Sequence, residues 1–435
     1  FKVFKGDQDD NSQRLKYLYS NLFKPVDQLK ILMNAENVEY IKKTYTQEGI
    51  YMLTQMVHQL KDCIQERSYN QVDPEKLYNP EKFKENCAKI GIENTDEKIP
   101  FNDVKEKYAA LLKNSIELRF RADVSVGFNI SGGLDSSTLL VFVNQMEGKE
   151  NINAYTFYTG HKDYDELFWV KEMINATQNP LNKVLLTVDH FTKEIDFLTH
   201  IQDEPCGGIP TIAYSKIFKE ARKDDVIVLL DGQGMDEQWA GYDYYLKKND
   251  QLIQGMEGSP FKKNVLSKEF LSKAKKPSYP TPFENELLNK QYRDLFYTKI
   301  PRALRFNDRV SMAYSTELRE PFLDYRLVEY AFAQPYEYKI KDGIQKYLLR
   351  ELVSEYLDDS ITNSPKRPLQ TPQREWLGNE LSGYVESKIK NLKDSDFASW
   401  FDINEMSNEW QKYKDGDNDS SFHIWQWISF SNLMK

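Results

Sequence analysis

A seven-residue loop between two apolar segments constrains the fold of this chain more than any other feature. The loop reads Ser-Gly-Gly-Leu-Asp-Ser-Ser at residues 131–137, directly after the apolar run 124–130 and before the apolar run 138–143. The pattern predicts a strand, a glycine turn and the start of a helix. Such a junction suits an anion, because Gly132 and Gly133 let backbone amides approach closely and a helix N-terminus adds positive potential.

The side chains of this loop indicate a polyphosphate ligand. Ser131, Ser136 and Ser137 can donate hydroxyl groups, whereas Asp135 would repel a polyphosphate unless a divalent cation such as Mg²⁺ lay between them. The loop lacks the ending of a P-loop and the spacing of Gly-x-Gly-x-x-Gly, which disfavours kinase-type and dinucleotide sites. It resembles the pyrophosphate loop of ATP pyrophosphatases, which cleave ATP between the α and β phosphates. A glycine-rich turn without a ligand is the alternative.

Length and charge exclude several classes of protein. The chain has 435 residues, of which 40% are hydrophobic, and a formal net charge of −9. Such a chain can bury a large core and form more than one domain. The acidic balance argues against a nucleic-acid partner and against an acidic membrane surface. No secretion signal and no apolar run of membrane-spanning length is visible, so we expect no membrane partner.

The cysteines and histidines show no metal-binding pattern. Cys63, Cys87 and Cys206 form no Cys-x-x-Cys pair, which predicts a reducing, cytoplasmic environment without structural zinc. The five histidines are scattered without ligand spacing. Because the chain begins with Phe1 rather than Met, we expect a processed or incomplete product.

Two regions of the chain differ in pattern. Residues 1–100 are polar, with one amphipathic stretch at 48–64, and predict a mainly helical accessory region that ends near the turn-forming residues 68–83. Residues 101–435 alternate strand and helix patterns and then become helical. We therefore predict the α/β class, a parallel sheet with helices on both faces, with helical N- and C-terminal elaborations. The tryptophan-rich C-terminus predicts a packed helical extension.

Apolar runs identify the central strands of this sheet. Their Val, Ile, Phe and Tyr content fits strands that are buried on both faces, and chemistry in such sheets collects at the carboxyl ends of the strands. The predicted strands span residues 124–130, 152–158, 183–188 and 226–230.

A second loop delivers carboxylates to the same edge. The run Asp-Gly-Gln-Gly-Met-Asp-Glu at residues 231–237 follows the fourth predicted strand. If that strand neighbours the first, Asp236 faces Asp135 across the triphosphate and completes a Mg²⁺ site. The alternative is that Asp236 caps a helix N-terminus. Two further acidic runs, Tyr-Asp-Glu at 164–166 and Asp-Glu-Pro at 203–205, also follow strands, and for these we favour a structural role such as a helix cap.

Together, the ordered motifs between about residues 104 and 376 resemble the synthetase domain of the asparagine synthetase B family, whose relatives include β-lactam synthetase. This domain has an ATP pyrophosphatase fold of the adenine-nucleotide α-hydrolase type. The motifs that carry the resemblance are those at residues 119–124, 131–137, 164–166, 203–205, 231–242, 307–313, 317–324 and 346–350.

The resemblance implies an ATP-dependent ligase that activates a small-molecule carboxylate as an acyl-adenylate, releases diphosphate and transfers the acyl group to ammonia. It implies Mg²⁺ at Asp135 and Asp236 and a charge-stabilising lysine at Lys366, a position where a cation suits the charge that gathers on the reacting phosphate. The implied catalytic residues are Lys366, Gln233 and Asp236, and the implied nucleotide-binding residues are Ser131, Gly132, Gly133, Asp135, Ser136, Ser137 and Gly232.

Two departures from the family pattern bear on function. Gln233 stands where the asparagine-forming enzymes carry the glutamate of Ser-Gly-Glu-Gly, and Asp231 stands where they carry the serine. Glutamine cannot act as a general base, so either substrate recognition differs or another group accepts the ammonium proton. The acidic charge has in effect moved by two positions, and an acceptor other than aspartate is plausible.

The amino terminus is the second departure. Glutamine-dependent members begin with a catalytic cysteine, whereas no glutaminase chemistry is visible here, and residues 1–100 resemble a remnant or replacement of that domain. Ammonia would then come from solution, from a separate glutaminase subunit or from a missing part of the chain. The alternative function is a catalytically degenerate ATP-binding or partner-dependent subunit of an amidotransferase.

Overall fold

The computed structural model of the chain describes residues 80–92, 99–146, 151–202, 204–205, 207–247, 262–275, 277–363, 371–417 and 420–433. The chain divides into two compact units, Phe1–Asn79 and Pro80–Lys435, and the described residues all belong to the second. The predicted amphipathic stretch at 48–64 and Lys366 lie outside the described residues. The predicted domain boundary at residues 100 and 101 stays a prediction.

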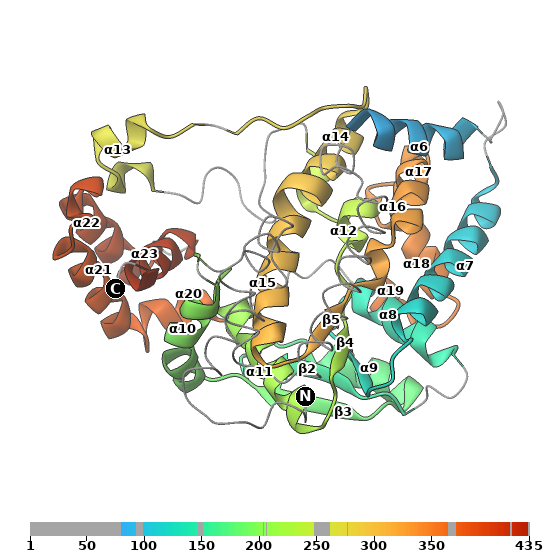
Figure 1. Cartoon of the computed structure of the whole chain (residues 1–435), viewed down its shortest axis with the longest axis horizontal. Helices are drawn as coiled ribbons and strands as arrows, with labels where there is room; N and C mark the ends of the chain where they lie inside the picture. Colours follow the sequence, from blue (N-terminus) through green and yellow to red (C-terminus); the bar gives the residue numbers. More distant parts are fainter. Residues whose placement is uncertain are drawn as a thin grey trace, which may run out of the picture. The chain divides into compact units, whose positions relative to one another are not determined.

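Within the described residues, five strands form a parallel sheet in the order β3-β2-β1-β4-β5 (Figure 1). Each strand pairs in parallel with its neighbours. The predicted α/β class with a parallel sheet is therefore confirmed. The strands are β1 (Val126–Asn129), β2 (Ala154–Tyr158), β3 (Leu181–Leu185), β4 (Val228–Leu230) and β5 (Glu317–Arg319).

The observed strands agree with the sequence pattern except at the two edges of the sheet. β1, β2 and β4 lie within their predicted runs, and β3 begins two residues before its predicted start. β3 also ends earlier than predicted, at Leu185, and helix α10 (Val188–Gln202) begins at the last residue of the predicted run. β5 was not predicted, since a three-residue strand flanked by charged residues leaves no apolar run to detect.

Alternation along the strands builds two hydrophobic cores, one on each face of the sheet. Val228 and Leu230 of β4 join one core, and Leu229 between them joins the other. The first core packs against α7 (Phe101–Arg119), α8 (Leu134–Asn144), α9 (Leu167–Thr177), α16 (Tyr325–Phe332) and α18 (Tyr347–Val353). The second packs against α10, α11 (Ile209–Lys223), α15 (Lys299–Ala313), α20 (Gln373–Gly378), α21 (Ser382–Lys393), α22 (Ile403–Lys414) and α23 (Phe422–Leu433).

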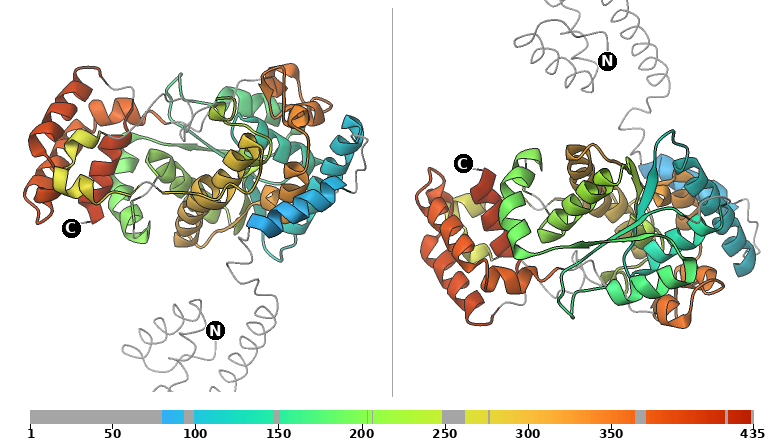
Figure 2. Two further views of the ribbon diagram at one scale, coloured as in Figure 1. Left: turned by 90° about the horizontal axis from the view of Figure 1, so that it is seen from above. Right: turned by 90° about the horizontal axis from the view of Figure 1, so that it is seen from below.

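Further helices and strands complete this unit. Figure 2 shows α6 and the C-terminal helices at opposite ends of it. The further elements are α6 (Pro80–Ile92), α12 (Met235–Gln238), α13 (Lys268–Ser272), α14 (Glu286–Arg293), α17 (Tyr336–Lys339), α19 (Asp359–Thr362) and the antiparallel pair β6 (Ile340–Lys341) and β7 (Ile344–Gln345).

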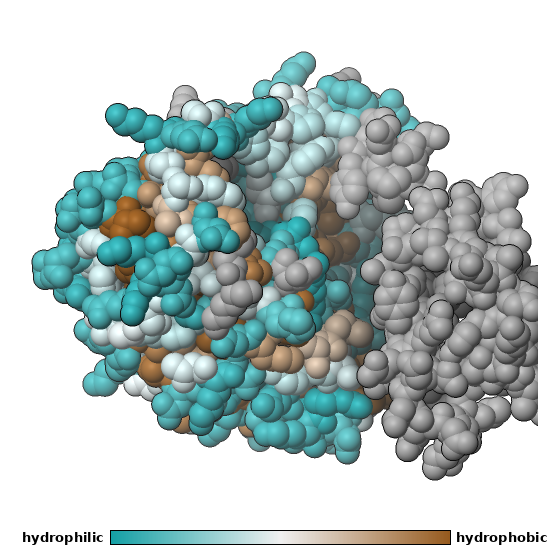
Figure 3. All heavy atoms as spheres, turned by 60° about the vertical axis from the view of Figure 1, so that its left-hand side comes forward, coloured by the Kyte–Doolittle hydropathy of each residue, from teal (hydrophilic) through white to brown (hydrophobic). Residues whose placement is uncertain are grey.

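The tryptophan-rich C-terminus is a packed helical extension, as predicted. Trp410, Trp425 and Trp427 are buried in the second core, and Trp400 stacks on Phe270 with ring centroids 4.7 Å apart. The outer surface of this region is mostly hydrophilic (Figure 3). None of the described helices has both the length and the apolar character that crossing a membrane requires.

The strand order places a ligand crevice between β1 and β4. From β1 the chain builds outward through β2 and β3, and it then returns to the other side of β1 to add β4 and β5. The connections therefore diverge at this point of the sheet, and a crevice opens outside the carboxyl ends of the two neighbouring strands. The two acidic loops follow β1 and β4 directly, so both border this crevice.

Candidate active site

The loop after β1 is closed by its own hydroxyl groups. Ser136 Oγ accepts a hydrogen bond from the Ser131 amide (3.0 Å) and donates to the Ser131 carbonyl (2.7 Å). Ser137 Oγ donates to the Gly133 carbonyl (2.8 Å), and Ser137 is fully buried. The hydroxyls of Ser136 and Ser137 therefore shape the loop, and their predicted role as phosphate donors stays a prediction.

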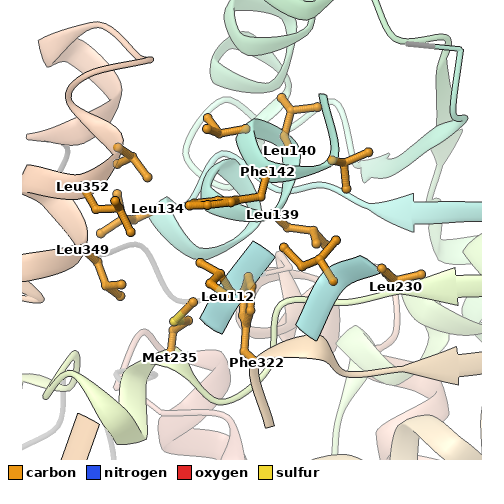
Figure 4. Packing of buried hydrophobic residues seen from close by; sticks show 14 of the residues in the cluster. Leu112, Leu134, Leu139, Leu140, Phe142, Leu230, Met235, Phe322, Leu349 and Leu352 are labelled. Carbon is orange, nitrogen blue, oxygen red and sulfur yellow. The ribbon is translucent and has the colours of Figure 1, made fainter. Parts of the chain in front are cut away.

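Helix α8 points its N-terminus at the crevice. Gly133 is its N-cap residue, in an extended conformation with φ −90° and ψ 158°, so the amides of the next three residues have no acceptor within the helix. Hydrophobic packing fixes the helix from all sides, with Leu349 and Leu352 of α18 lying toward Leu134 (Figure 4). The buried helix thus holds its positive end in place.

A cavity of about 770 Å³ lies over this helix N-terminus. Its walls come from the loop after β1, the loop after β4 and the turn before α18. Among the predicted site residues that the structure describes, Gly132 and Ser137 do not line it, and Gly132 instead donates its amide to Glu166 Oε2 (3.2 Å). The predicted residues that do line it are Ser131, Gly133, Asp135, Ser136, Gly232, Gln233 and Asp236.

The structure brings Asp135 and Asp236 together around a buried lysine. Lys346 Nζ lies 2.5 Å from Asp135 Oδ1 and 2.6 Å from Asp236 Oδ1. Burial alone would lower the pKa of Lys346, but the two carboxylates outweigh burial and raise it, so the ammonium group stays charged. The interpretation of Asp236 as a helix cap is wrong, because Gly234 is the N-cap residue of α12 and Asp236 lies inside its first turn.

Local backbone geometry makes this contact possible. A Cβ atom on Gly241 would lie 2.0 Å from Asp236 Oδ1 and 2.2 Å from Lys346 Cε, so the ion pair requires a glycine there. Gly234 adopts φ +108°, and a Cβ atom on it would lie 2.4 Å from Leu323 Cδ2. Lys346 itself is left-handed, with φ 54°, which is rare for a residue with a side chain. The loop after β4 and the turn before α18 are thus built to meet.

A second pair of acidic groups lies beside the first. Asp231, at the end of β4, accepts hydrogen bonds from the Gly232 amide (2.8 Å) and the Tyr214 hydroxyl (3.1 Å). Glu320, directly after β5, accepts one from the Gln233 amide (3.2 Å). Burial raises the pKa of Asp231 although the Gly232 and Tyr214 bonds oppose the shift. Burial and repulsion by Asp231 raise the pKa of Glu320.

The other acidic runs have identifiable partners. Asp165 accepts hydrogen bonds from the amides of Thr159 (2.6 Å) and Gly160 (2.7 Å), which fixes the turn after β2. Glu166 lines the cavity as well as holding Gly132. Glu204 forms an ion pair with Arg305 (2.5 Å), while Asp203 lies outside the described residues. The contacts of Asp165 and Glu204 are therefore structural, whereas Glu166 also borders the site.

Sequence reasoning missed three charged residues of the site. Lys346 and Arg350 line the cavity, and Glu320 supports the loop after β4. Lys346 and Arg350 belong to the motif at residues 346–350, and Glu320 belongs to the motif at 317–324, but neither motif indicates a contact. The cavity is acidic overall: Lys346 and Arg350 face the carboxylates of Asp135, Glu166, Asp231, Asp236 and Glu237.

Comparison with known proteins identifies the family of this chain. A family model described as asparagine synthase matches residues 107–435, which is most of the chain and includes the whole site. The chain belongs to the asparagine synthase family. Membership accounts for the two loops that flank the crevice, and it confirms the resemblance that the motifs indicated.

Relatives of known name are identical to this family member at about a quarter of the aligned residues. The glutamine-hydrolyzing asparagine synthetase 3 of Bacillus subtilis (strain 168) is 26% identical over 328 residues, 68% of this chain and 53% of the relative. The glutamine-hydrolyzing asparagine synthetase of Rattus norvegicus is 28% identical over 315 residues, 69% of this chain and 50% of the relative. The chain thus spans about half the length of these relatives.

Among solved structures, the U34-tRNA thiolase NcsA from Methanococcus maripaludis with its 4Fe-4S cluster overlaps 72% of this chain and 81% of its own. The two chains are 11% identical, and the TM-score is 0.29. An overlap this weak carries no inference about the asparagine synthase family member described here.

Proposed function

We propose that this chain uses ATP to activate a small-molecule carboxylate as an acyl-adenylate, releases diphosphate and transfers the acyl group to ammonia, forming an amide and AMP. The observation that carries the proposal is the meeting of the α8 N-terminus and the Asp135–Lys346–Asp236 cluster in one cavity of about 770 Å³. Ammonia comes from solution, from a separate glutaminase subunit or from a part of the protein outside this chain.

The loop after β1 supports the nucleotide assignment. The first amides of α8 and its dipole favour a phosphate group at the end of β1. Because the hydroxyls of Ser136 and Ser137 already close the loop, these amides are oriented before a ligand binds. Lys346 and Arg350 border the same space and supply positive charge where diphosphate would depart. Lys366, by family resemblance, adds a further cation to that step.

The donor set at this site fits Mg²⁺. Asp135 and Asp236 direct oxygen atoms at a single cation within 2.6 Å, and carboxylate oxygens are the ligands that Mg²⁺ prefers. A triphosphate would otherwise face the carboxylates that dominate the cavity wall. Bound Mg²⁺ would neutralise charge between these carboxylates and the phosphates. We assign Asp135 and Asp236 as its ligands.

One observation favours a second candidate, a nucleotide-binding subunit without turnover of its own. Gln233 stands in the position of the family's glutamate and cannot accept a proton. Such a protein would bind Mg-ATP in the same cavity and release no diphosphate with any carboxylate and ammonia.

The test is acceptor-dependent exchange of labelled diphosphate into ATP, together with amide formation. A panel of amino acids and sugar acids, beginning with aspartate, is combined with ammonium chloride or with glutamine. We expect one acceptor to drive exchange, and ammonium to yield amide where glutamine does not. Asp135→Asn and Lys366→Ala should each reduce exchange by ~100-fold or more, the loss typical of removing one preorganised charged group.

Asp123→Asn is the matched control, because Asp123 is an exposed carboxylate just before β1, at the opposite end of that strand. It should leave exchange unchanged. Exchange that persists in both Asp135→Asn and Lys366→Ala would contradict the proposed site. ATP binding without exchange under every condition would favour the second candidate.

A further inference from the structure

Gln233 stands in the position of the family's glutamate, yet a carboxylate two residues earlier lines the cavity. Asp231 is 6% exposed and lines the cavity at the carboxyl end of β4. Its two oxygens are oriented by the Gly232 amide and the Tyr214 hydroxyl. The backbone of Gly232 runs close to the start of α8, since a Cβ atom there would lie 3.5 Å from the Ser136 amide nitrogen. Asp231 is therefore held beside the predicted phosphate loop.

Glu320 directly follows β5, the strand that pairs with β4. It accepts the Gln233 amide through Oε2, while Oε1 is buried without a hydrogen-bond partner among the described residues. The two carboxyl groups repel each other when both are charged, which raises the pKa of Glu320 and by reciprocity opposes ionisation of Asp231. On its other side Glu320 borders a second cavity of about 350 Å³ that Arg305 and Asp308 of α15 also line.

An independent feature indicates a polar ligand at this point. Asn129, the last residue of β1, is 6% exposed and lines the same cavity as Asp231. Its amide group lies close enough to hydrogen-bond Asp231 and to oppose the rise in the pKa of that carboxyl group, whereas its buried Oδ1 has no hydrogen-bond partner within the described residues. A buried carbonyl oxygen without a partner is unfavourable by about 1–3 kcal/mol. A ligand that donates a hydrogen bond to Oδ1 would relieve that penalty.

We infer that Asp231 is the proton acceptor for the attacking nitrogen, that Asn129 contacts the reacting groups and that Glu320 is a positioning residue. This inference rests on the proposed function. The lone pair of ammonia attacks the acyl carbon, one N–H proton passes to the Asp231 carboxylate, and the bond between the acyl carbon and the adenylate oxygen breaks. The products are the amide, AMP and a protonated Asp231, so atoms and charge balance.

Other groups near this point are less suited to accept the proton. Gln233 carries no base, and Glu166 holds the Gly132 amide of the loop after β1, away from the end of β4. Tyr214 donates its hydroxyl to Asp231. Burial and the neighbouring acidic groups Asp231 and Glu320 raise the pKa of Tyr214, so it stays protonated.

The experiment separates adenylate formation from amide formation. Exchange of diphosphate into ATP reports the first step, and labelled amide reports the second, with whichever carboxylate of the panel drives exchange. Asp231→Asn should lower amide formation by ~10²–10⁴-fold, the usual contribution of a general base, while exchange falls less than amide formation. Hydroxylamine is a weaker base than ammonia and is neutral at pH 7, so it should be affected less.

A rescue variant makes the test specific. Asp231→Ser combined with Gln233→Glu recreates the family's Ser-Gly-Glu-Gly and should recover amide formation at least tenfold over Asp231→Asn. Glu320→Gln should shift the acidic limb of the pH profile for amide formation to lower pH. Asp224→Asn is the control: Asp224 also accepts a hydrogen bond from a tyrosine, Tyr155 (3.0 Å), but does not line the cavity.

Equal loss of exchange and amide formation in Asp231→Asn, with no recovery in the double variant, would overturn the assignment of Asp231 and leave the proposed ligase intact. If Asp231→Asn does not fold, the folded double variant decides by the same two rates. Absence of exchange in the unmodified protein with every acceptor would overturn the proposed function and this inference together.

Discussion

Two pairs of carboxyl groups lie beyond the carboxyl ends of the sheet, and their charge is balanced in different ways. Asp135 and Asp236 share the ammonium group of Lys346. Asp231 and Glu320 form no ion pair in the described part of the chain and are surrounded by amides and a tyrosine hydroxyl. Their pKa values are raised by burial, with mutual repulsion adding to the shift of Glu320.

The difference indicates what each pair can hold. Two carboxylates directed at one point offer oxygen atoms of the kind that bind a divalent cation, so the first pair suits the proposed metal site. A pair with raised pKa values takes up a proton more readily than ordinary carboxylates do, which suits acid–base chemistry. The two pairs therefore differ in the charge that their surroundings favour, because, of the two pairs, only Asp135 and Asp236 contact a lysine among the described residues.

The largest effect is expected from removing the lysine. Lys346→Met leaves two partly buried carboxylates without a cation and should lower the free energy of unfolding by about 3–5 kcal/mol, as for a broken buried ion pair. Urea unfolding at pH 7 measures it. Lys341→Met is the control, because Lys341 is exposed and should change stability by less than about 0.5 kcal/mol. Equal stability of the two variants would remove the distinction between the pairs.

A smaller effect is expected from pushing the same ion pair apart. Gly241→Ala places a methyl group against Asp236 and Lys346 and should destabilise by about 1–3 kcal/mol, as overpacking does. Gly383→Ala is the matched control in helix α21, where a Cβ atom meets no other atom within 4 Å. That change should stabilise by up to about 1 kcal/mol through helix propensity. Thermal unfolding of both variants would show opposite shifts, and shifts of the same sign would contradict the geometry.

The smallest effect concerns the pair without a lysine, and it depends on pH. The raised pKa of Glu320 means that the folded state binds more protons than the unfolded state above about pH 4, so the free energy of unfolding falls as pH rises. Glu320→Gln removes this penalty and should make the protein more stable than the unmodified chain at pH 8, by about 1.4 kcal/mol for each unit of pKa elevation. The advantage should vanish near pH 4.

Asp324 should make the free energy of unfolding depend on pH with the opposite sign to Glu320. Burial opposes its ionisation, but hydrogen bonds from Arg326 and Arg119 outweigh burial and lower its pKa. Its contribution to stability is present above the pKa of an unfolded aspartate and is lost as pH falls. Asp324→Asn should therefore lower stability most at neutral pH and least in acid. Parallel pH profiles for the Glu320 and Asp324 variants would refute the assigned shifts.

Much of the fold could be predicted because its signals are local. The runs that became β1, β2 and β4 are apolar and end in glycine or acidic loops, so strand, turn and helix follow from neighbouring residues. β5 escaped because three residues cannot show a period, and its place in the sheet depends on pairing with β4 across the chain. Residues 131–137 were placed correctly at a strand–helix junction for the same local reason.

The site was only partly predictable because its decisive contacts are long-range. Lys346 meets Asp135 across 211 positions of sequence, and the contact depends on a left-handed residue and on the missing Cβ of Gly241. No spacing rule encodes such an approach. The roles of the serines depend on rotamers: Ser136 and Ser137 donate inward to backbone carbonyls, which a hydroxyl in a sequence does not reveal.

The left-handed backbone of Lys346 sets a limit on redesign. Such a conformation costs about 1–2 kcal/mol for an L-residue, and glycine would relieve it. At Gln178, another left-handed position, that replacement keeps the backbone amide that caps α9 and removes only a side chain that donates to the Asn175 carbonyl. At position 346 it would remove the cation that holds two loops together. An optimisation guided by backbone conformation alone would therefore gain about 1–2 kcal/mol and lose more by leaving Asp135 and Asp236 without their cation, so the strained backbone here marks a residue that the site requires.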